Sequence, residues 1–433
     1  MTARTNTARP HIVVLGAGFG GLTFASEFPP HLARLTLVDR QNHHLFQPLL
    51  YQVATAGLAA PDIAQPIRSI LRKRRDLTVL MAEARAIRLD DRTVLLDRGE
   101  LAYDHLVIAL GGRTSYFGHS EWEQHAPGLK SIDDALRIRR QVLLAFELAE
   151  TESDPQRREQ LMTIVVVGGG PTGVELAGTF AELARTVLRR DFDHIDPARA
   201  RVILIEAGPR VLASFSPKLS ASAQRQLARL GVDVRTNTSV KAIREGEVDI
   251  TSGTLRAATV IWSAGVAAHP LTSTLGIETD RAGRLKVLPD LSLPGHPEAF
   301  GIGDLVTLAD RNGVTVPGIA PAAMQMGAHV ARLLGHAIRS GETQHPRAAF
   351  AYRDKGSMAT IGRSAAVAHI GRLEFSGWAA WVAWLTVHLI FLVGFRNKLS
   401  VFIQWVYSYV TYKRGARIIT GMDKRPQPGP PPN

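Results

Sequence analysis

The chain has 433 residues and a formal net charge of +12, with 45% hydrophobic and 21% charged residues. This length allows two or three domains with large cores. The sequence contains no cysteine, which excludes disulfide frameworks, thiolate zinc sites and iron–sulfur clusters. The positive charge suggests nucleic acid or an anionic membrane as a partner, and the position of the charges along the chain distinguishes the two.

The first predicted strand, residues 11–15, runs into a glycine loop with the pattern G-x-G-x-x-G. Between a strand and a helix, this pattern is typical of a dinucleotide-binding unit. The first glycine makes a tight turn, the second lets the backbone approach a pyrophosphate, and the third lets helix and strand pack closely. The next predicted strand ends at an acid expected to bind an adenosine ribose. The predicted contacts are Gly16, Gly18, Phe19, Gly20, Gly21, Asp39 and the adjacent Arg40.

Short strands are predicted at residues 77–80, 86–89, 94–96 and 106–110. The last of them ends at Gly111, where the backbone should approach the same nucleotide. Residues 133–150 predict an amphipathic helix with Asp133 or Asp134 near its N-cap. The polar stretch 151–160 is expected to be a linker.

A second strand and glycine loop begin at residue 164 and repeat the first pattern. A long helix, from Val174 to about Arg190, leads to a strand that ends at Glu206, and a later strand leads to Gly265. The predicted contacts of this second nucleotide are Gly168, Gly170, Pro171, Thr172, Gly173, Glu206 and Gly265. Two dinucleotide sites suggest that electrons pass from one nucleotide to the other. Glu206 would repel a 2′-phosphate, which favours NADH over NADPH, although Arg210 lies nearby in sequence.

Some enzymes that bind a flavin and a second nucleotide pass electrons through a redox-active cysteine pair, which this chain lacks. A flavin bound here would therefore give its electrons directly to another acceptor. Asp304 follows a predicted strand and precedes the helix predicted at residues 321–334. It is expected to bind the ribityl chain of a flavin, with a simple turn residue as the alternative.

The C-terminal region is apolar and aromatic. Residues 378–395 carry no formal charge, and residues 401–410 continue the apolar pattern. The first run is short for a membrane span and rich in tryptophan, which favours a helix in the plane of the interface. A buried helix or a dimer helix is the alternative. Proline-rich residues beyond Met422 are expected to be disordered.

The basic residues near the C-terminus flank these apolar segments and are opposed only by Asp423. We expect them to face lipid headgroups rather than nucleic acid. The N-terminus has no apolar signal region, so the chain is expected to remain in the compartment where it is made. The basic residues are Arg396, Lys398, Lys413, Arg414, Arg417, Lys424 and Arg425.

Over nearly its whole length, the chain resembles the type II NADH dehydrogenases, single-subunit NADH:quinone oxidoreductases of respiratory membranes. Besides the two glycine loops, the resemblance rests on residues 42–54, 173–178, 262–266, 301–304, 388–389 and 394–396. It implies an α/β fold with two Rossmann-like dinucleotide-binding domains, similar to glutathione reductase, and C-terminal membrane-associating helices. The implied segments are a flavin domain in two parts (10–160 and 269–345), an NADH domain (161–268) and a C-terminal domain (346–433).

The resemblance implies bound FAD, with NADH and a membrane quinone as substrates and no metal. It adds Gln47 and Pro48 to the flavin contacts, and implies a homodimer attached peripherally to the cytoplasmic side of the cell inner membrane. Glu175 is implied as a proton-path acid, with complementing the helix dipole as its alternative. Gln325 would bond a quinone or flavin carbonyl, or lie on a helix surface. Tyr51 and Phe46 line a quinone channel, or belong to the core.

One position departs from the family pattern. The family carries A-Q-x-A-x-Q beside the flavin, and here the first glutamine is Pro321, which offers neither a side-chain amide nor an N–H. Two other functions therefore remain open beside the quinone reductase. One is a reductase of a soluble protein or oxygen, and the other is a flavin- and NAD-binding redox sensor.

Overall fold

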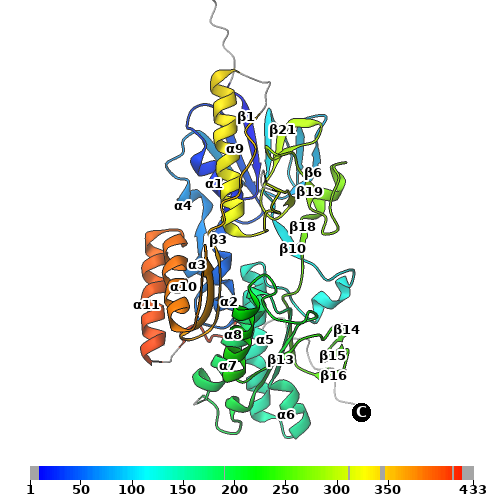
Figure 1. Cartoon of the computed structure of the whole chain (residues 1–433), viewed down its shortest axis with the longest axis vertical. Coiled ribbons are helices and arrows are strands. Elements are labelled where there is room, and N and C mark those ends of the chain that lie inside the picture. Colours follow the sequence, from blue (N-terminus) through cyan, green and yellow to red (C-terminus); the bar gives the residue numbers. More distant parts are fainter. Residues whose placement is uncertain (1–8, 190, 311–312, 342–346, 412–413, 422–433) are drawn as a thin grey trace, which may run out of the picture. The chain divides into compact units, whose positions relative to one another are not determined.

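The computed structural model describes residues 9–189, 191–310, 313–341, 347–411 and 414–421 (Figure 1). The chain forms two compact units, each assembled from three stretches of sequence. The first contains Met1–Leu45, Ala64–Ser115 and Val266–Lys355, and the second contains Phe46–Ile63, Tyr116–Gly265 and Gly356–Asn433. The domain boundaries expected from the sequence remain a prediction, because the two units are defined by contacts within the chain and not by which nucleotide each part binds.

The first unit is built on a six-stranded sheet with the order β20-β21-β9-β1-β2-β5. Strand β1 pairs in parallel with β2 on one side and with β9 on the other. All five residues of β1 are buried, as expected for a central parallel strand. The strands are β1 (His11–Leu15), β2 (Arg34–Asp39), β5 (Leu77–Met81), β9 (His105–Ile108), β20 (Ser292–Leu293) and β21 (His296–Gly301).

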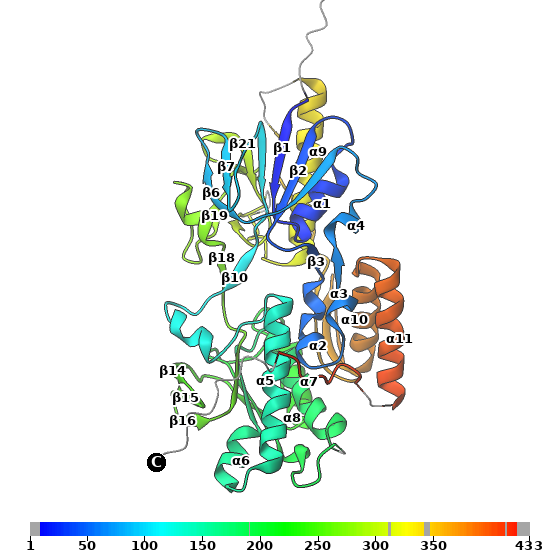
Figure 2. The same cartoon turned by 180° about the vertical axis from the view of Figure 1, so that it is seen from behind.

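Helices α1 (Phe19–Glu27) and α9 (Ala320–Ser340) pack side by side on this sheet (Figures 1 and 2). A Cβ atom on Gly327 would lie 2.3 Å from the Gly20 carbonyl oxygen, so glycine is required where the helices meet. The smaller elements of this unit are β3 (His43–Leu45), β4 (Ala64–Pro66), α4 (Ile67–Ile70), β6 (Ala84–Arg88), β7 (Thr93–Leu96), β8 (Glu100–Ala102), β10 (Gly112–Thr114), β18 (Val266–Ala268), β19 (Leu285–Lys286) and β22 (Val306–Thr307).

The second unit repeats the central pattern with a four-stranded sheet in the order β13-β12-β11-β17. Strand β11 pairs in parallel with β12 and β17, as β1 does with β2 and β9. The loop after β11 leads into α7 (Pro171–Glu182), which continues as a π-helical turn, Leu183–Val187. The predicted long helix therefore ends at Val187 rather than near Arg190. The strands are β11 (Thr163–Val167), β12 (Arg201–Ile205), β13 (Val232–Arg235) and β17 (Thr259–Trp262).

Of two predictions about the chain before β11, one is confirmed and one needs correction. Helix α5 (Ile132–Thr151) is capped by Ser131, whose hydroxyl accepts from the Asp134 N–H at 3.1 Å. Asp134 is the N3 residue of a capping box, so the prediction that Asp133 or Asp134 lies near the N-cap is confirmed. The predicted linker contains helix α6 (Pro155–Leu161), which forms because Asp154 caps it and Pro155 suits its first turn.

The C-terminal part of the second unit is an antiparallel sheet flanked by helices. The predicted C-terminal helices are α10 (Trp378–Phe391), which ends before Gly394, whose φ is 87°, and α11 (Phe395–Thr411). Helix α10 packs on β24, and α7 packs on β23. The other elements are α2 (Leu50–Ala54), α3 (Ala60–Ile63), α8 (Pro217–Arg229), β14 (Val240–Arg244), β15 (Glu247–Ile250), β16 (Gly253–Arg256), β23 (Ser357–Gly362), β24 (Ala365–Ile370) and β25 (Leu373–Ser376).

Among the described residues, no helix is long and apolar enough to cross a membrane. The segment beyond Met422, predicted to be disordered, lies outside the described residues.

Candidate nucleotide and quinone sites

The two glycine loops meet the same steric demands in the two units. A Cβ on Gly21 would lie 1.9 Å from the Gly16 carbonyl oxygen, and one on Gly173 would lie 1.8 Å from the Gly168 carbonyl oxygen. The first glycines, Gly16 and Gly168, adopt φ values of 97° and 108°. The chain itself therefore requires glycine at the first and third positions of both loops.

The second glycine of each loop is different. A Cβ on Gly18 or Gly170 would meet no atom within 4 Å, and both residues have ordinary negative φ values. Both are N-caps without a side-chain hydrogen bond, so the first N–H groups of α1 and α7 have no capping side chain. Open space beside a helix N-terminus fits a pyrophosphate, so the loops pass a steric test for two dinucleotides.

The acids at the ends of β2 and β12 make equivalent contacts. Asp39 Oδ2 accepts from the Ala17 N–H at 2.6 Å, and Glu206 Oε2 accepts from the Gly169 N–H at 2.6 Å. Each second carboxylate oxygen accepts from a backbone N–H two residues further on, of Gln41 and Gly208. Sequence reasoning assigned these acids to a ribose, and the structure adds that each holds its own glycine loop in place.

The other predicted flavin contacts are divided between the units. Asp304 follows β21 in the first unit, and its half-buried carboxylate has no hydrogen bond or ion pair with any residue in the described ranges. Gly111 has a φ of 68° and open space where a Cβ would be. Arg40 is exposed, while Gln47 and Pro48 form the short 3₁₀ helix Gln47–Leu49 of the second unit. Gly265, a predicted contact of the second nucleotide, has a φ of 76° and follows β17, the strand of the second unit that corresponds to β9.

Glu175 lies on the first turns of α7, and its carboxyl group is buried at 9% exposure. Burial raises the pKa of Glu175 well above its usual range, and a hydrogen bond from the Thr360 backbone N–H opposes the shift only in part. Glu175 is buried because β23 packs very closely on α7. Gly178 makes this approach possible, since a Cβ there would lie 1.6 Å from the Ile361 carbonyl oxygen. The side chain therefore points into the protein, whereas an acid that only complements the helix dipole is normally solvated.

Gln325 lies on α9 and bonds the extended segment that follows this helix. Its Nε2 donates to the Arg353 carbonyl oxygen, and its Oε1 accepts from the Arg353 N–H, both at 2.9 Å. A primary amide has a second N–H and a further lone pair, so the side chain retains capacity for a ligand. Pro321 occupies the first turn of α9, where a missing N–H breaks no helical hydrogen bond.

The comparisons with known proteins agree with this geometry. A family model described as pyridine nucleotide-disulphide oxidoreductase matches residues 10–327, and one described as NDH2 C-terminal domain matches residues 355–412. The chain is 43% identical to the type II NADH:quinone oxidoreductase Ndh of Mycobacterium tuberculosis, over 95% of this chain and 90% of the relative. This chain belongs to the type II NADH:quinone oxidoreductase family. The enzyme class, oxidoreductase function and two-domain flavoprotein fold predicted from the sequence are confirmed.

More distant relatives are similar over comparable lengths. An internal alternative NAD(P)H-ubiquinone oxidoreductase of Arabidopsis thaliana mitochondria is 28% identical, over 95% of this chain and 86% of the relative. The solved structure of NDH2 from Plasmodium falciparum in complex with NADH has a TM-score of 0.87 at 21% identity. The two chains are covered to 95% and 100%, which extends the agreement in fold to the C-terminal helices.

In this type II oxidoreductase, the basic C-terminal residues do not all face outward, contrary to the prediction. Arg414 is buried at 8% exposure, ion-paired to Glu182 at 3.3 Å and bonded to the Thr55 carbonyl oxygen at 3.0 Å. Arg417 is ion-paired to Asp191. The prediction that these two arginines face lipid headgroups is wrong, because acids far away in the sequence neutralise them. Lys413, Lys424 and Arg425 lie outside the described residues.

Sequence reasoning missed the polar contacts that hold α11 to the segment around α2 and α3. Buried Asp62 accepts from the Ser400 hydroxyl at 2.8 Å and from Gln404 Nε2 at 2.9 Å. Trp405 Nε1 donates to Gln52 Oε1 at 2.9 Å. No local pattern marks these residues, because the partners lie far apart in the chain, for example 338 positions between Asp62 and Ser400.

An aromatic cluster accompanies these contacts in the second unit. The ring of Trp384 stacks on His388 at 4.0 Å and meets the edge of Tyr51 at 6.3 Å. Burial lowers the pKa of His388 to about 4, although its bond to the Trp384 carbonyl oxygen opposes the shift. His388 is therefore neutral at pH 7. Among the described residues, no group of three His, Asp or Glu side chains could hold a metal ion.

Proposed function

We propose that this protein oxidises NADH, uses FAD as its bound cofactor and reduces a membrane quinone. The proposal rests on the 43% identity to a type II NADH:quinone oxidoreductase across 95% of the chain. The two open second glycines, Gly18 and Gly170, supply the physical requirement for two dinucleotides. The bound FAD would supply the redox chemistry between NADH and the quinone, and the protein would bind and orient the reactants.

The residues of the first unit are suited to hold FAD. The loop from Gly16 to Gly21 and the N-terminus of α1 would bind its pyrophosphate. Asp39 anchors that loop, and the unpaired carboxylate of Asp304 is available to accept from a ribityl hydroxyl. We assign the corresponding loop from Gly168 to Gly173, with Glu206, to NADH.

Glu175 would serve as a proton-path acid of the reaction. Burial raises the pKa of this carboxyl group well above its usual range, which favours the protonated form that can supply a proton when a quinone is reduced. Gln325 would bond a quinone or flavin carbonyl with its remaining N–H. We regard Pro321 as compatible with this role, because it leaves α9 and Gln325 intact.

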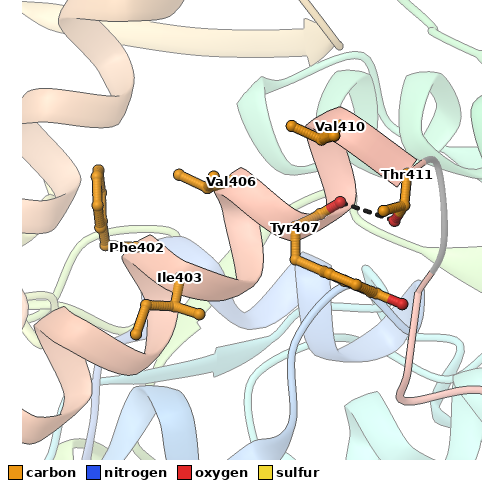
Figure 3. Close-up of a pocket in the computed structure, with 6 residues that line it drawn as sticks. All are labelled: Phe402, Ile403, Val406, Tyr407, Val410 and Thr411. Atoms are coloured by element: carbon orange, nitrogen blue, oxygen red, sulfur yellow. Dashed lines mark hydrogen bonds between the residues drawn. The ribbon is translucent and has the colours of Figure 1, made fainter.

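We also propose that α11 lies on an anionic membrane surface at the cytoplasmic side of the cell inner membrane. Its outer side chains are apolar and exposed, with Phe402 at 50%, Val406 at 47% and Val410 at 74% exposure. Figure 3 shows these three residues along the helix with Ile403, Tyr407 and Thr411. Arg396 and Lys398 remain candidates for headgroup contacts. Binding to vesicles with and without an anionic lipid tests this attachment.

The resemblance also implies a homodimer. Light scattering of the purified protein, at several concentrations, tests this oligomeric state directly. A monomer at all concentrations would remove the dimer from the proposal without affecting the redox function.

The first experiment on the reaction is steady-state oxidation of NADH and NADPH by the purified holoenzyme, with and without a short-chain quinone. We expect rapid oxidation of NADH that requires quinone, and poor use of NADPH. Oxidation that does not depend on quinone would instead support reduction of a soluble acceptor or a redox-sensing role.

A further inference from the structure

The side-chain amide of Gln52 connects helix α11 to a buried tyrosine. Trp405 Nε1 donates to Gln52 Oε1 at 2.9 Å, and Gln52 Nε2 donates to the Tyr51 hydroxyl oxygen at 2.8 Å. An indole N–H can only donate, so the oxygen of the amide must face Trp405. The NH₂ group of Gln52 must then face Tyr51, and the orientation of the amide is fixed.

The fixed amide determines what the Tyr51 hydroxyl group can do. Because Gln52 donates to it, the hydroxyl oxygen acts as an acceptor there, and its own proton points elsewhere. Among the described residues, the Tyr51 hydroxyl donates no hydrogen bond of its own. Tyr51 is only 4% exposed, and burial raises its pKa well above the usual value. The hydroxyl therefore keeps its proton and presents an unpaired donor in a buried place.

A second unpaired donor lies on the neighbouring ring. The indole N–H of Trp384 has no partner among the described residues, and Trp384 is 1% exposed. Its ring meets the edge of Tyr51 with 6.3 Å between the ring centres. Buried donors without partners are rare in folded proteins, and they often mark a place where a ligand or a water molecule completes the hydrogen bonds.

We propose that Gln52, held by Trp405, is a positioning residue that leaves the Tyr51 hydroxyl proton free to donate to a carbonyl oxygen of the quinone headgroup. This inference rests on the proposed quinone reductase function. A quinone carbonyl is an acceptor without protons of its own, and its flat ring suits the aromatic surroundings of Tyr51 and Trp384. Because Trp405 belongs to α11, the C-terminal helix would set the orientation of the donor.

The test separates the two halves of the reaction in the FAD-loaded holoenzyme. Reduction of the flavin by NADH is followed without oxygen, and steady-state kinetics are measured with a short-chain quinone. The key variant is Gln52→Glu, because a carboxylate can only accept and would capture the Tyr51 proton. We expect a roughly tenfold fall in kcat/KM for the quinone, the effect of one neutral hydrogen bond, and an unchanged rate of flavin reduction.

Two comparisons distinguish positioning from general packing. Gln52→Met leaves the Tyr51 proton uncaptured, so its loss of kcat/KM should be smaller than that of Gln52→Glu. In a Tyr51→Phe background, Gln52→Glu should cause no further loss, because it acts only through Tyr51. Ser400→Ala is the matched control, since it removes one hydrogen bond between α11 and Asp62 and leaves Gln52 untouched.

Several results would overturn the inference. They are unchanged quinone kinetics in Gln52→Glu and Tyr51→Phe, additive losses in the double variant, or an equal fall in flavin reduction and quinone kinetics. Unchanged kinetics in Tyr51→Phe would mean that the hydroxyl binds only a buried water molecule. Failure of the proposed function looks different, because the wild-type flavin would then be reduced by NADH and not reoxidised by quinone.

Discussion

The Oε2 atom of Glu206 lies 2.6 Å from the backbone nitrogen of Gly169, so the acid that follows β12 also fixes the loop after β11. The carboxylate thereby lies beside the place where the adenosine ribose of NADH would bind. The Glu206 carboxylate would therefore both hold the glycine loop in place and favour NADH over NADPH.

Replacing this acid should weaken discrimination against NADPH. In Glu206→Gln the repulsion of a 2′-phosphate disappears, and a change of about 1.4 kcal/mol corresponds to tenfold in specificity. We expect the NADPH-to-NADH ratio of kcat/KM to rise roughly tenfold. Asp39→Asn, the equivalent change in the first loop, should lower retention of FAD and leave that ratio unchanged. An unaltered ratio in Glu206→Gln would remove the charge argument.

The second and third glycines of the NADH loop should respond differently to alanine. In Gly170→Ala the new Cβ meets nothing in the chain, so the melting temperature should stay within about 2 °C, equivalent to about 0.5 kcal/mol. The KM for NADH should nevertheless rise, because the methyl group occupies the space for the pyrophosphate. Gly173→Ala places a Cβ 1.8 Å from a carbonyl oxygen and should destabilise the protein by about 2 kcal/mol or more. Equal melting temperatures would contradict this assignment.

The buried carboxyl group of Glu175 should make stability depend on pH. Its folded-state pKa is raised above the unfolded value of 4.5, so the folded state binds more protons between those two values. Stability is fully present below pH 4.5 and falls as the pH rises toward the folded pKa, by at most about 1.4 kcal/mol per pH unit. Glu175→Gln should remove this fall, so in thermal unfolding the variant gains on the wild type over the pH range above 4.5. A constant difference across that range would argue against a protonated Glu175.

Glu175→Gln also provides a kinetic check. An amide cannot supply a proton, so quinone turnover should slow by about tenfold to a hundredfold without being abolished. Stopped-flow reduction of the flavin by NADH should change little. Normal turnover in this variant would favour a purely structural role for the acid.

Asp62 should hold α11 in place. Asp62→Ala removes the acceptor of Ser400 and Gln404 and leaves their buried groups unpaired, at a cost of about 2–3 kcal/mol. We expect faster amide hydrogen exchange in α11, with α8 as the internal reference helix. Protection that falls equally in both helices would indicate global destabilisation instead.

Replacing Arg414 tests whether its charge stabilises the fold or binds the membrane. Removing it in Arg414→Ala strands Glu182 and should destabilise the protein by about 3 kcal/mol, because the pair is largely buried. Binding to anionic vesicles should stay unchanged, whereas the double variant Arg396→Ala with Lys398→Ala should weaken it. Loss of vesicle binding in Arg414→Ala, with a normal melting temperature, would restore the headgroup role predicted from the sequence.

The sequence alone determined the parts of this protein that depend on neighbouring residues. The loops at Gly16 and Gly168, the acids Asp39 and Glu206, and the strands around them follow from local patterns of glycine and apolar residues. A glycine turn between a strand and a helix has only a few possible geometries, so its chemistry can be predicted from a short stretch. The family resemblance rests on short stretches of the same kind, which is why the amino-acid sequence carries it.

Only the tertiary structure decided which polar groups became partners. Gln52 and Trp405 lie 353 positions apart, and nothing in either neighbourhood predicts their hydrogen bond. Arg414 resembles a membrane-facing residue in sequence, and it is buried because Glu182 lies beside it in the fold. Glu175 is buried because Gly178 lets β23 approach α7. The charge and proton state of a side chain depend on what surrounds it in space, and chain folding sets those surroundings.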